Sequence, residues 1–444
     1  NIHVPENDAD QAESLKRVSF EEFFFFQIAI ILRRLSITRQ KGIQHKITDA
    51  QTMRFIDSFP FKFTSAQKRV IREIREDMQK ATPMLRLLQG DVGSGKTVVA
   101  IFGCFSAFLN GTQSCIMAPT EILARQHYDK IKGMIEAGSL KGIQVRLLVS
   151  SISTVDKKVI YEEIKRGLVH LVVGTHALFS ENLEFKNLSF VVIDEQHKFG
   201  VKQRALLAQK GNNPDVLVMT ATPIPRTLCI TLYGDLDISV IDELPPGRPP
   251  IQTFHFPTEQ SAEVYNMVRE KLKSGAQAYI VYPIIEESEK LDLKAAQDMY
   301  KHFMQHEFKD FKIGLVHGQM KSSDSEINME EFKKGKIQLL VATSVLEVGV
   351  DVPNATVMVI EHAERFGLSS LHQLRGRIGR GNKESSCYLL ADMETLEAQK
   401  RIEAILIPIV GANGVRARID ADMDFTSEEV SSENFNPKDK IIRS

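Results

Sequence analysis

One short string of residues constrains the fold of this chain more than any other. Residues 87–97 read LLQGDVGSGKT, which contains the pattern Gly-x-x-x-x-Gly-Lys-Thr. An apolar run at residues 84–88 leads into this string, and residues 98–109 follow it with the composition of a buried helix. Between a strand and a helix, this pattern forms a loop whose backbone N–H groups surround phosphate oxygens. The string therefore predicts a phosphate-binding loop in an α/β domain.

Two side chains of this loop have specific expected roles. Lys96 is expected to neutralise charge on the β- and γ-phosphates of ATP, and the Thr97 hydroxyl is expected to bind Mg²⁺. The alternative is a chance glycine-rich turn, which the strand before the loop and the helix after it disfavour. The candidate nucleotide-binding residues of the loop are Gly90, Asp91, Val92, Gly93, Ser94, Gly95, Lys96 and Thr97.

Short apolar runs alternate with helical stretches on both sides of a proline-rich interruption. Continuous apolar strands separated by helices are typical of a parallel sheet that is covered on both faces. Residues 244–250, LPPGRPP, suit a stiff extended linker between two such sheets. The expected strands are 84–88, 114–117, 145–149, 171–173, 190–193 and 216–219, and then 278–282, 313–316, 337–341, 356–360 and 387–390.

This alternation divides the chain into four expected regions. Residues 12–35 are expected to form one helix, and its phenylalanines Phe23–Phe26 are expected to pack on a neighbouring domain. A polar, partly basic connector is expected at residues 36–60, and an irregular, poorly ordered segment at residues 407–444. The regions are a helical linker segment (1–60), a first lobe (61–250), a second lobe (251–395) and a tail (396–444).

Composition narrows the class of protein. The chain has 444 residues, of which 43% are hydrophobic and 25% charged, as in ordinary globular domains. Its net charge of −1 neither supports nor excludes a nucleic-acid partner. The four cysteines form no CxxC pair, so neither a zinc site nor a disulfide framework is expected. No apolar run reaches the roughly 18 residues of a membrane span, and no signal peptide is expected.

An acidic pair follows the strand expected at residues 190–193. Asp194 is expected to hold Mg²⁺, and Glu195 to polarise the attacking water. Taken alone, such a pair is more often a solvated turn or a helix cap. Its place about a hundred residues after a phosphate-binding loop favours the metal interpretation.

Upstream of the loop, residues 59–67 read FPFKFTSAQ. The amide of Gln67 carries both a donor and an acceptor, so it is a candidate to pair with the adenine edge. The alternative is that Thr64 simply caps the helix that follows.

The second lobe contributes residues 373–380, QLRGRIGR. Arg377 and Arg380 are three residues apart and share one face if this segment is helical. Arginine stabilises the charge that builds up on a transferring phosphoryl group. The alternative is a generic basic patch; the phosphate-binding loop in the other lobe favours arginine fingers. Gln373 stands in the same string and is a further catalytic candidate.

These motifs, in this order, resemble those of superfamily 2 helicases of the DExH kind, with DEQH at residues 194–197 as the box itself. The strings MAPTEILA (117–124), VGTHAL (173–178) and VATSVLEVGVDVP (341–353) are similar to the RecG family of bacterial branched-DNA helicases. The translocase Mfd shares TATPIPRT (220–227), whereas GDVGSGKT and DELPPGR (242–248) favour the RecG family. The resemblance runs from about residue 12 to about residue 405.

The resemblance implies an α/β fold of two RecA-like P-loop lobes, with ATP and Mg²⁺ between them and DNA across their top. It implies a cytoplasmic, nucleoid-associated bacterial enzyme that acts as a monomer on forks and Holliday junctions. Implied DNA-backbone contacts are Pro119, Thr120, Gly174, Thr175, His176 and Thr343. Implied coupling residues are His197, Thr220 and Thr222, and Gly349 and Asp351 are implied to approach the nucleotide from the second lobe.

The sequence also departs from the family pattern. Lys198 stands where the family pattern has Arg. The family's N-terminal wedge is not among these residues, and its C-terminal element is not recognisable after residue 405. Three interpretations follow: a DNA helicase that remodels branched DNA or a similar duplex translocase, a DNA-binding remnant with an idling ATPase, and a P-loop kinase or signalling NTPase. The third does not account for the arginine pair in a second lobe.

Overall fold

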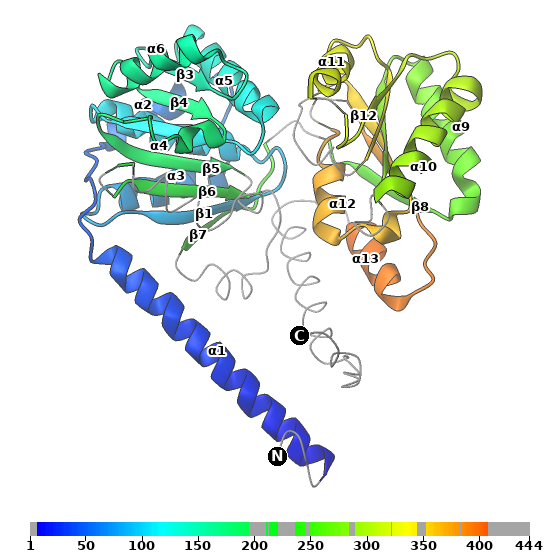
Figure 1. The fold of residues 1–444 in the computed structure, drawn as a ribbon, viewed down its shortest axis with the longest axis horizontal. Helices are drawn as coiled ribbons and strands as arrows, with labels where there is room; N and C mark the ends of the chain where they lie inside the picture. Colours follow the sequence, from blue (N-terminus) through cyan, green and yellow to red (C-terminus); the bar gives the residue numbers. More distant parts are fainter. Residues whose placement is uncertain are drawn as a thin grey trace.

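The computed structural model describes residues 7–194, 210–211, 213–220, 236–245, 249–283, 289–320, 322–343, 352–379, 381 and 383–406. Two parallel β-sheets, each flanked by helices, form two lobes (Figure 1). We call the sheet nearer the N-terminus, with its helices, the first lobe, and the other sheet, with its helices, the second lobe. The expected α/β fold with two parallel sheets is confirmed.

The first sheet has seven strands in the order β3-β4-β2-β5-β6-β1-β7, all paired in parallel. Its strands are β1 (Leu85–Gly90), β2 (Gln113–Met117), β3 (Val145–Leu148), β4 (Leu171–Gly174), β5 (Leu188–Asp194), β6 (Asp215–Thr220) and β7 (Asp237–Ile241). Its helices are α2 (Asp49–Asp57), α3 (Ser65–Met78), α4 (Lys96–Leu109), α5 (Glu121–Glu136), α6 (Thr154–Lys165) and the short 3₁₀ helix η1 (His176–Phe179).

The second sheet has six parallel strands in the order β10-β11-β9-β12-β13-β8. Its strands are β8 (Gln252–Phe256), β9 (Gln277–Tyr282), β10 (Ile313–Val316), β11 (Leu339–Thr343), β12 (Ala355–Ile360) and β13 (Ser386–Leu390). Its helices are η3 (Thr258–Gln260), α9 (Ser261–Lys273), α10 (Glu289–His302), η5 (Phe303–Glu307), α11 (Ser322–Lys333), η7 (Ala363–Arg365), α12 (Leu368–Arg375) and α13 (Leu396–Leu406).

Burial on both faces explains why the central strands read as continuous apolar runs. Every residue of β5 and β6 is buried. Within β1, Leu87 packs in one apolar cluster and Leu88 in another, because successive side chains of a strand point to opposite faces. The eleven strands expected from the sequence therefore lie within two residues of the observed ones.

Two strands, β7 and β8, were not expected. Both lie at the edge of a sheet, where one side lacks a neighbouring strand. β7 reads DISVI and is only partly buried, and β8 reads QTFHF with its residues exposed or half-buried. Such strands carry polar residues between apolar ones, so they give no continuous apolar run.

The connector expected at residues 36–60 is partly wrong, because α2 lies within it. The Thr48 side chain accepts a hydrogen bond from the Gln51 backbone, and the Gln51 side chain accepts one from the Thr48 backbone. This reciprocal capping starts the helix. Its Phe55 is 1% exposed and packs on Phe59 and Phe102, so this segment belongs to the core of the first lobe.

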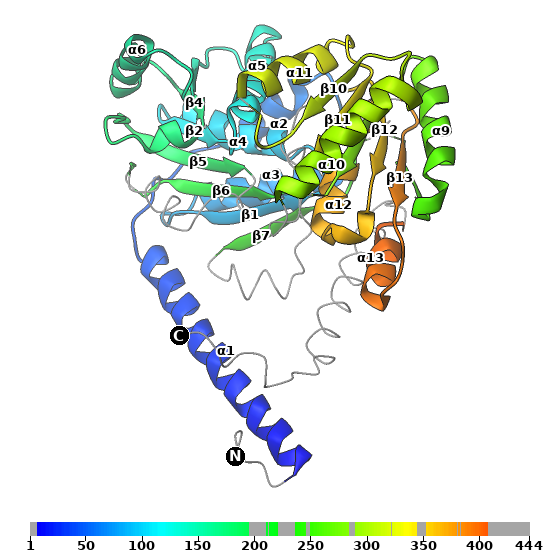
Figure 2. The same ribbon diagram turned by 45° about the vertical axis from the view of Figure 1, so that its right-hand side comes forward.

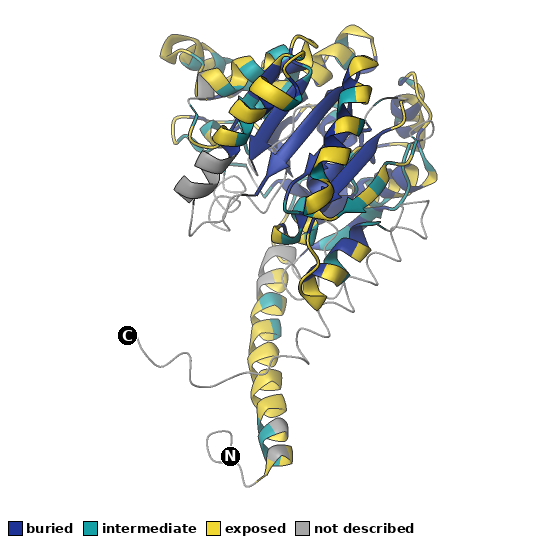
Figure 3. Ribbon diagram, turned by 90° about the vertical axis from the view of Figure 1, so that its right-hand side faces the viewer, coloured by how far each residue is buried: buried dark blue, intermediate teal, exposed yellow. Residues whose placement is uncertain are grey.

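Helix α1 (Asp8–Thr38) confirms the helix expected at residues 12–35. It projects away from both lobes (Figures 1 and 2), and much of its surface is exposed (Figure 3). An ion pair of 2.7 Å between Arg34 and Asp237 ties it to β7. The packing partner expected for Phe23–Phe26 is not in this chain's described residues, where these four side chains are between 43% and 68% exposed. None of the helices described in the structure has the length and apolarity required to span a membrane.

Candidate active site between the lobes

The carboxyl ends of adjacent strands bring the candidate nucleotide and metal residues of the first lobe together. β6 lies between β1 and β5, with Gln89 of β1 opposite Thr220 of β6 and Asp194 of β5 opposite Met219. The loop after β1, the end of β6 and Asp194 therefore share one edge of the sheet. In parallel α/β sheets, ligands bind at this edge.

The loop at residues 90–97 has the backbone that phosphate binding requires. Gly93 and Gly95 have φ angles of 80° and 90°, in the left-handed region that favours glycine. Helix α4 begins at Lys96, directly after the loop. The Lys96 ammonium donates hydrogen bonds to the carbonyl oxygens of Gly90, at 2.6 Å, and Asp91, at 3.0 Å. A cation thus lies inside the curve of the loop.

Gln67 is held against this loop. Its Nε2 donates to the Ser94 carbonyl oxygen at 2.8 Å, and its Oε1 accepts from the Thr64 backbone N–H at 3.0 Å. A Cβ atom added to Gly95 would collide with the Gln67 amide. Helix capping by Thr64 and contact of Gln67 with the nucleotide loop therefore occur together, and the pairing of Gln67 with adenine stays a prediction.

Asp194 has a partner that the sequence did not single out. The Nε2 atom of His127, on α5, lies 2.8 Å from Oδ2 of Asp194, and the two residues are 8% and 9% exposed. His127 comes seven residues after Thr120, which caps α5. Two helical turns separate them, so they lie on about the same face of the helix. That spacing was the only signal in the sequence that could have linked His127 to this edge.

The arginine-rich string of the second lobe does not form one helix. Helix α12 ends at Arg375, with Gly376 as its C-cap, and Gly379 has a φ angle of 67°. The condition for Arg377 and Arg380 to share a helical face is therefore not met, because α12 ends at Arg375, before Arg377. Gln373 and Arg377 are buried, at 5% and 8% exposure.

The second lobe meets the nucleotide loop at Gly376. A Cβ atom placed on Gly376 would lie 2.6 Å from Cβ of Val92, so only glycine allows this approach. A cleft between the lobes opens beside this contact. It is lined by Asp91, Val92, Leu244, Pro249, Pro250, Ile251, His372, Arg375 and Gly376.

Arg375 is buried beside this cleft, at 5% exposure. Its guanidinium donates to the carbonyl oxygen of Ile405 at 2.9 Å. Burial lowers the pKa of Arg375, and the negative charge of Asp91 acts in the opposite direction. Arg375 thus places a positive charge of the second lobe near Asp91 of the nucleotide loop.

The residues implied to contact DNA lie at or just after the carboxyl ends of strands in the two sheets. Thr120 accepts a hydrogen bond from the Leu123 backbone at 3.4 Å, and Gly174 ends β4. His176 is exposed, whereas Thr175 and Thr343 are 2% and 0% exposed. The hydroxyls of these two threonines have no hydrogen-bond partner within the described ranges. Contact between DNA and these two hydroxyls therefore requires local rearrangement.

Several candidates lie outside the described residues. They are Glu195, His197, Thr222, Gly349, Asp351 and Arg380. Their expected roles, and those of the other site residues, stay predictions.

The chain is similar in sequence to known helicases. A family model of DEAD/DEAH box helicases matches residues 64–229, and a model of the helicase conserved C-terminal domain matches residues 260–382. The ATP-dependent DNA helicase RecG of Synechocystis is 48% identical over 402 residues, which cover 90% of this chain and 48% of that protein. The RecG of Aquifex aeolicus is 51% identical over 381 residues, 85% of this chain and 48% of that protein.

Over 90% of its length, the chain is similar to RecG helicases.

A solved structure of RecG bound to a three-way DNA junction agrees with this similarity. It matches with a TM-score of 0.80 and 42% identity, covering 93% of this chain and 54% of that one. The chain thus spans about half the length of the RecG proteins it matches. Residues 406–444 match a different model, that of the flagellar M-ring protein C-terminal region, and they fall almost entirely outside the described residues.

Proposed function

We propose that this chain is an ATP-dependent DNA motor of the RecG family that remodels branched DNA, including forks and Holliday junctions. One observation carries the proposal: the segment after α12, which bears Arg377, contacts the nucleotide loop of the first lobe at Gly376 and Val92. Such contact lets hydrolysis at one lobe change the position of the other. The chain is also similar to RecG across both lobes. We further propose that it acts as a monomer in the bacterial cytoplasm, associated with the nucleoid.

ATP fits the loop after β1. The Ser94 hydroxyl is buried and lacks a hydrogen-bond partner within the described part of the chain, as expected of a group that awaits a phosphate oxygen. Lys96 now donates to two loop carbonyls and would turn to the β- and γ-phosphates. Thr97 and Asp194 would hold Mg²⁺, which neutralises charge on the phosphates. Glu195 would orient the attacking water.

Arginines of the second lobe complete the reaction in this proposal. Arg377 and Arg380 would approach the γ-phosphate as the lobes close and stabilise the charge that develops there. Gln373, Gly349 and Asp351 would reach the nucleotide from the same side. Because these groups come from a separate lobe, their arrival depends on lobe closure, and their departure follows hydrolysis.

DNA would cross both lobes at the carboxyl edges of the sheets. Pro119, Thr120, Gly174, Thr175, His176 and Thr343 would contact the sugar-phosphate backbone. Small and hydroxyl-bearing residues on loops position a phosphate chain without reading its bases. His197, Thr220 and Thr222 would link these contacts to the nucleotide.

The test is ATP turnover by the purified chain, without DNA, with linear duplex and with a model fork. We expect turnover that requires Mg²⁺ and that fork DNA stimulates. Lys132→Ala, an exposed position on α5, is the matched control for Lys96→Ala. Turnover that DNA does not change would instead indicate an idling ATPase. Turnover that survives Lys96→Ala would refute the nucleotide site itself.

A further inference from the structure

Helix α5 joins two parts of the site that the proposed function treats separately. Its N-terminal end lies at Thr120, a candidate contact to the DNA backbone whose hydroxyl caps the helix. Two turns later, His127 reaches the Asp194 carboxylate at 2.8 Å. Thr120 and His127 are therefore about 10 Å apart along the helix axis, because each residue adds about 1.5 Å.

The first turn of α5 is fastened to the neighbouring loop. The Glu121 carboxylate accepts hydrogen bonds from the Ser151 hydroxyl and from the Arg125 guanidinium, the latter at 2.7 Å. Ser151 follows β3, at the same edge of the sheet. The position of α5 along the edge is thus fixed at its start by Glu121 and along its buried face by His127.

The contact between His127 and Asp194 is well suited to orient a metal ligand. Both side chains are largely buried, so water does not compete freely for the hydrogen bond. Carboxylates that bind metal ions are themselves usually held by outer partners, and loss of such a partner typically costs about 10- to 100-fold in metal affinity or activity. His127 engages Oδ2 of the Asp194 carboxylate and so restricts the rotation of that carboxylate.

We propose that His127 is a positioning residue: it holds the Asp194 carboxylate in the orientation that binds Mg²⁺ and ties that carboxylate to the helix that starts at the DNA edge. The inference rests on the proposed function, because it takes Asp194 to be the Mg²⁺ ligand. In this proposal, a displacement of Thr120 on DNA binding would be transmitted along α5 to His127 and so to the carboxylate that binds the metal.

The test compares His127→Leu, which removes the ring nitrogens, with His127→Gln, whose amide nitrogen can replace Nε2. Asp129→Ala, an exposed position on the same helix, is the control. We expect His127→Leu to raise the half-saturating concentration of Mg²⁺, or of Mn²⁺ measured by its electron paramagnetic resonance, about tenfold. Binding of a fluorescent ATP analogue without metal should not change. His127→Gln should recover most of the metal affinity.

A second measurement tests the link to DNA. At saturating Mg²⁺, His127→Leu should reduce the stimulation of ATP turnover by fork DNA, while the affinity for that DNA without nucleotide stays unchanged. Unaltered metal dependence in folded His127→Leu, or tighter metal binding, would overturn the positioning role. Full DNA stimulation in that variant would overturn the link through α5.

These outcomes remain distinct from a failure of the proposed function. If the unaltered chain neither binds Mg²⁺–ATP nor hydrolyses it, the proposed function fails, and with it the role of Asp194. If the unaltered chain is active and His127→Leu matches it, only the inference fails. If His127→Leu does not fold, His127→Gln decides: metal affinity and DNA stimulation close to those of the unaltered chain support positioning by an N–H donor, and about tenfold weaker metal binding in the folded Gln variant overturns it.

Discussion

Two buried arginines, Arg86 in the first lobe and Arg375 in the second, are held in place by different means. In the first lobe, Arg86 is the second residue of β1 and donates hydrogen bonds to Asp77 through Nε at 2.8 Å and to the Ser239 hydroxyl at 2.7 Å. In the second lobe, Arg375 and Arg377 sit at and beyond the end of a short helix, and Arg375 bonds to a main-chain carbonyl. Arg86 is thus held mainly by other side chains, whereas Arg375 donates to the main chain.

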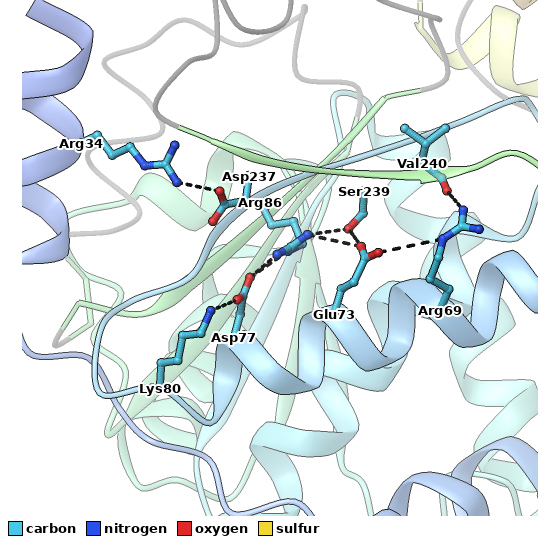
Figure 4. Close-up of polar contacts among 9 residues, drawn as sticks. All are labelled: Arg34, Arg69, Glu73, Asp77, Lys80, Arg86, Asp237, Ser239 and Val240. Atoms are coloured by element: carbon cyan, nitrogen blue, oxygen red, sulfur yellow. Dashed lines mark hydrogen bonds and ion pairs between the residues drawn. The ribbon is translucent and has the colours of Figure 1, made fainter. Parts of the chain in front are cut away.

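The network around Arg86 ties three elements of the first lobe together (Figure 4). Glu73 and Asp77 come from α3, and Ser239 comes from β7. Further along the same helix, Arg69 donates to the Val240 carbonyl oxygen and to Asp242, each at 2.8 Å. Helix α3 also carries Gln67, which touches the nucleotide loop. Hydrogen bonds and ion pairs therefore connect α3, β1 and β7 beneath that loop.

The difference suggests a division of labour. The first lobe presents a nucleotide loop supported by side-chain contacts among α3, β1 and β7. The second lobe presents cations whose distance from that loop depends on how closely the lobes approach at Gly376 and Val92. A preorganised site stabilises charge without reorganising during the reaction. In the proposed mechanism, closure of the second lobe would therefore determine when ATP is hydrolysed.

The largest expected effect comes from the fixed platform. Lys96→Ala should leave the fold intact and remove ATP turnover, because no other side chain of the loop brings a positive charge to the phosphates. Steady-state ATPase assays on the folded variant measure this. Turnover within a few-fold of the unaltered chain would contradict the assignment of the loop.

The next effect tests the moving lobe. Arg377→Ala should keep nucleotide affinity nearly normal while lowering turnover about 10³-fold, the scale of a missing arginine finger. Nucleotide binding and single-turnover hydrolysis separate the two quantities. If DNA binding is lost while basal turnover stays normal, Arg377 belongs to a basic surface that holds the DNA.

The third effect concerns stability. Arg86→Met removes one partner of a buried network and leaves the buried Asp77 with the exposed Lys80 as its remaining described ion-pair partner. This should cost about 3 kcal/mol in the free energy of unfolding, the lower end of the range for a buried charge that loses a partner. Chemical denaturation measures it. Arg146→Ala is the control, because its pair with Glu163 is 39% and 28% exposed and such pairs contribute about 0–1 kcal/mol. Equal losses in the two variants would mean that the buried network around Arg86 contributes no more than an exposed ion pair.

The smallest effect tests the contact between the lobes. Gly376→Ala places a methyl group against Val92 and should weaken Mg²⁺–ATP binding and turnover by about tenfold, or roughly 1.4 kcal/mol. Adding Val92→Ala should recover part of the loss, as expected for two residues in contact. Gly367→Ala is the control, since a Cβ atom there meets nothing within 4 Å. Additive losses in the double variant would mean that the two residues do not meet in solution.

The sequence predicted the frame of the molecule better than its polar network. Apolar runs located eleven strands because burial on both faces leaves a local signal, and the edge strands β7 and β8 lack that signal. Arg86 reads only as an interruption of an apolar run, since its partners lie 9 and 153 residues away along the chain. His127 was missed for the same reason: its contact with Asp194 spans 67 residues. Apart from the seven-residue spacing between Thr120 and His127, such pairings follow from the folded arrangement and leave no local pattern.

Helix α1 has a practical consequence for anyone who prepares this protein. The ion pair that ties it to β7 is about half exposed on both sides, at 45% and 47%, so it contributes about 0–1 kcal/mol. Meanwhile the helix presents several large apolar side chains to water, among them Phe20, Phe23, Phe25 and Leu32, each at least 59% exposed. Apolar surface of that extent promotes association between molecules. Concentrated samples should therefore sediment as a mixture of sizes, and detergent below its micelle concentration, or removal of residues 1–40, should sharpen the distribution to a single species.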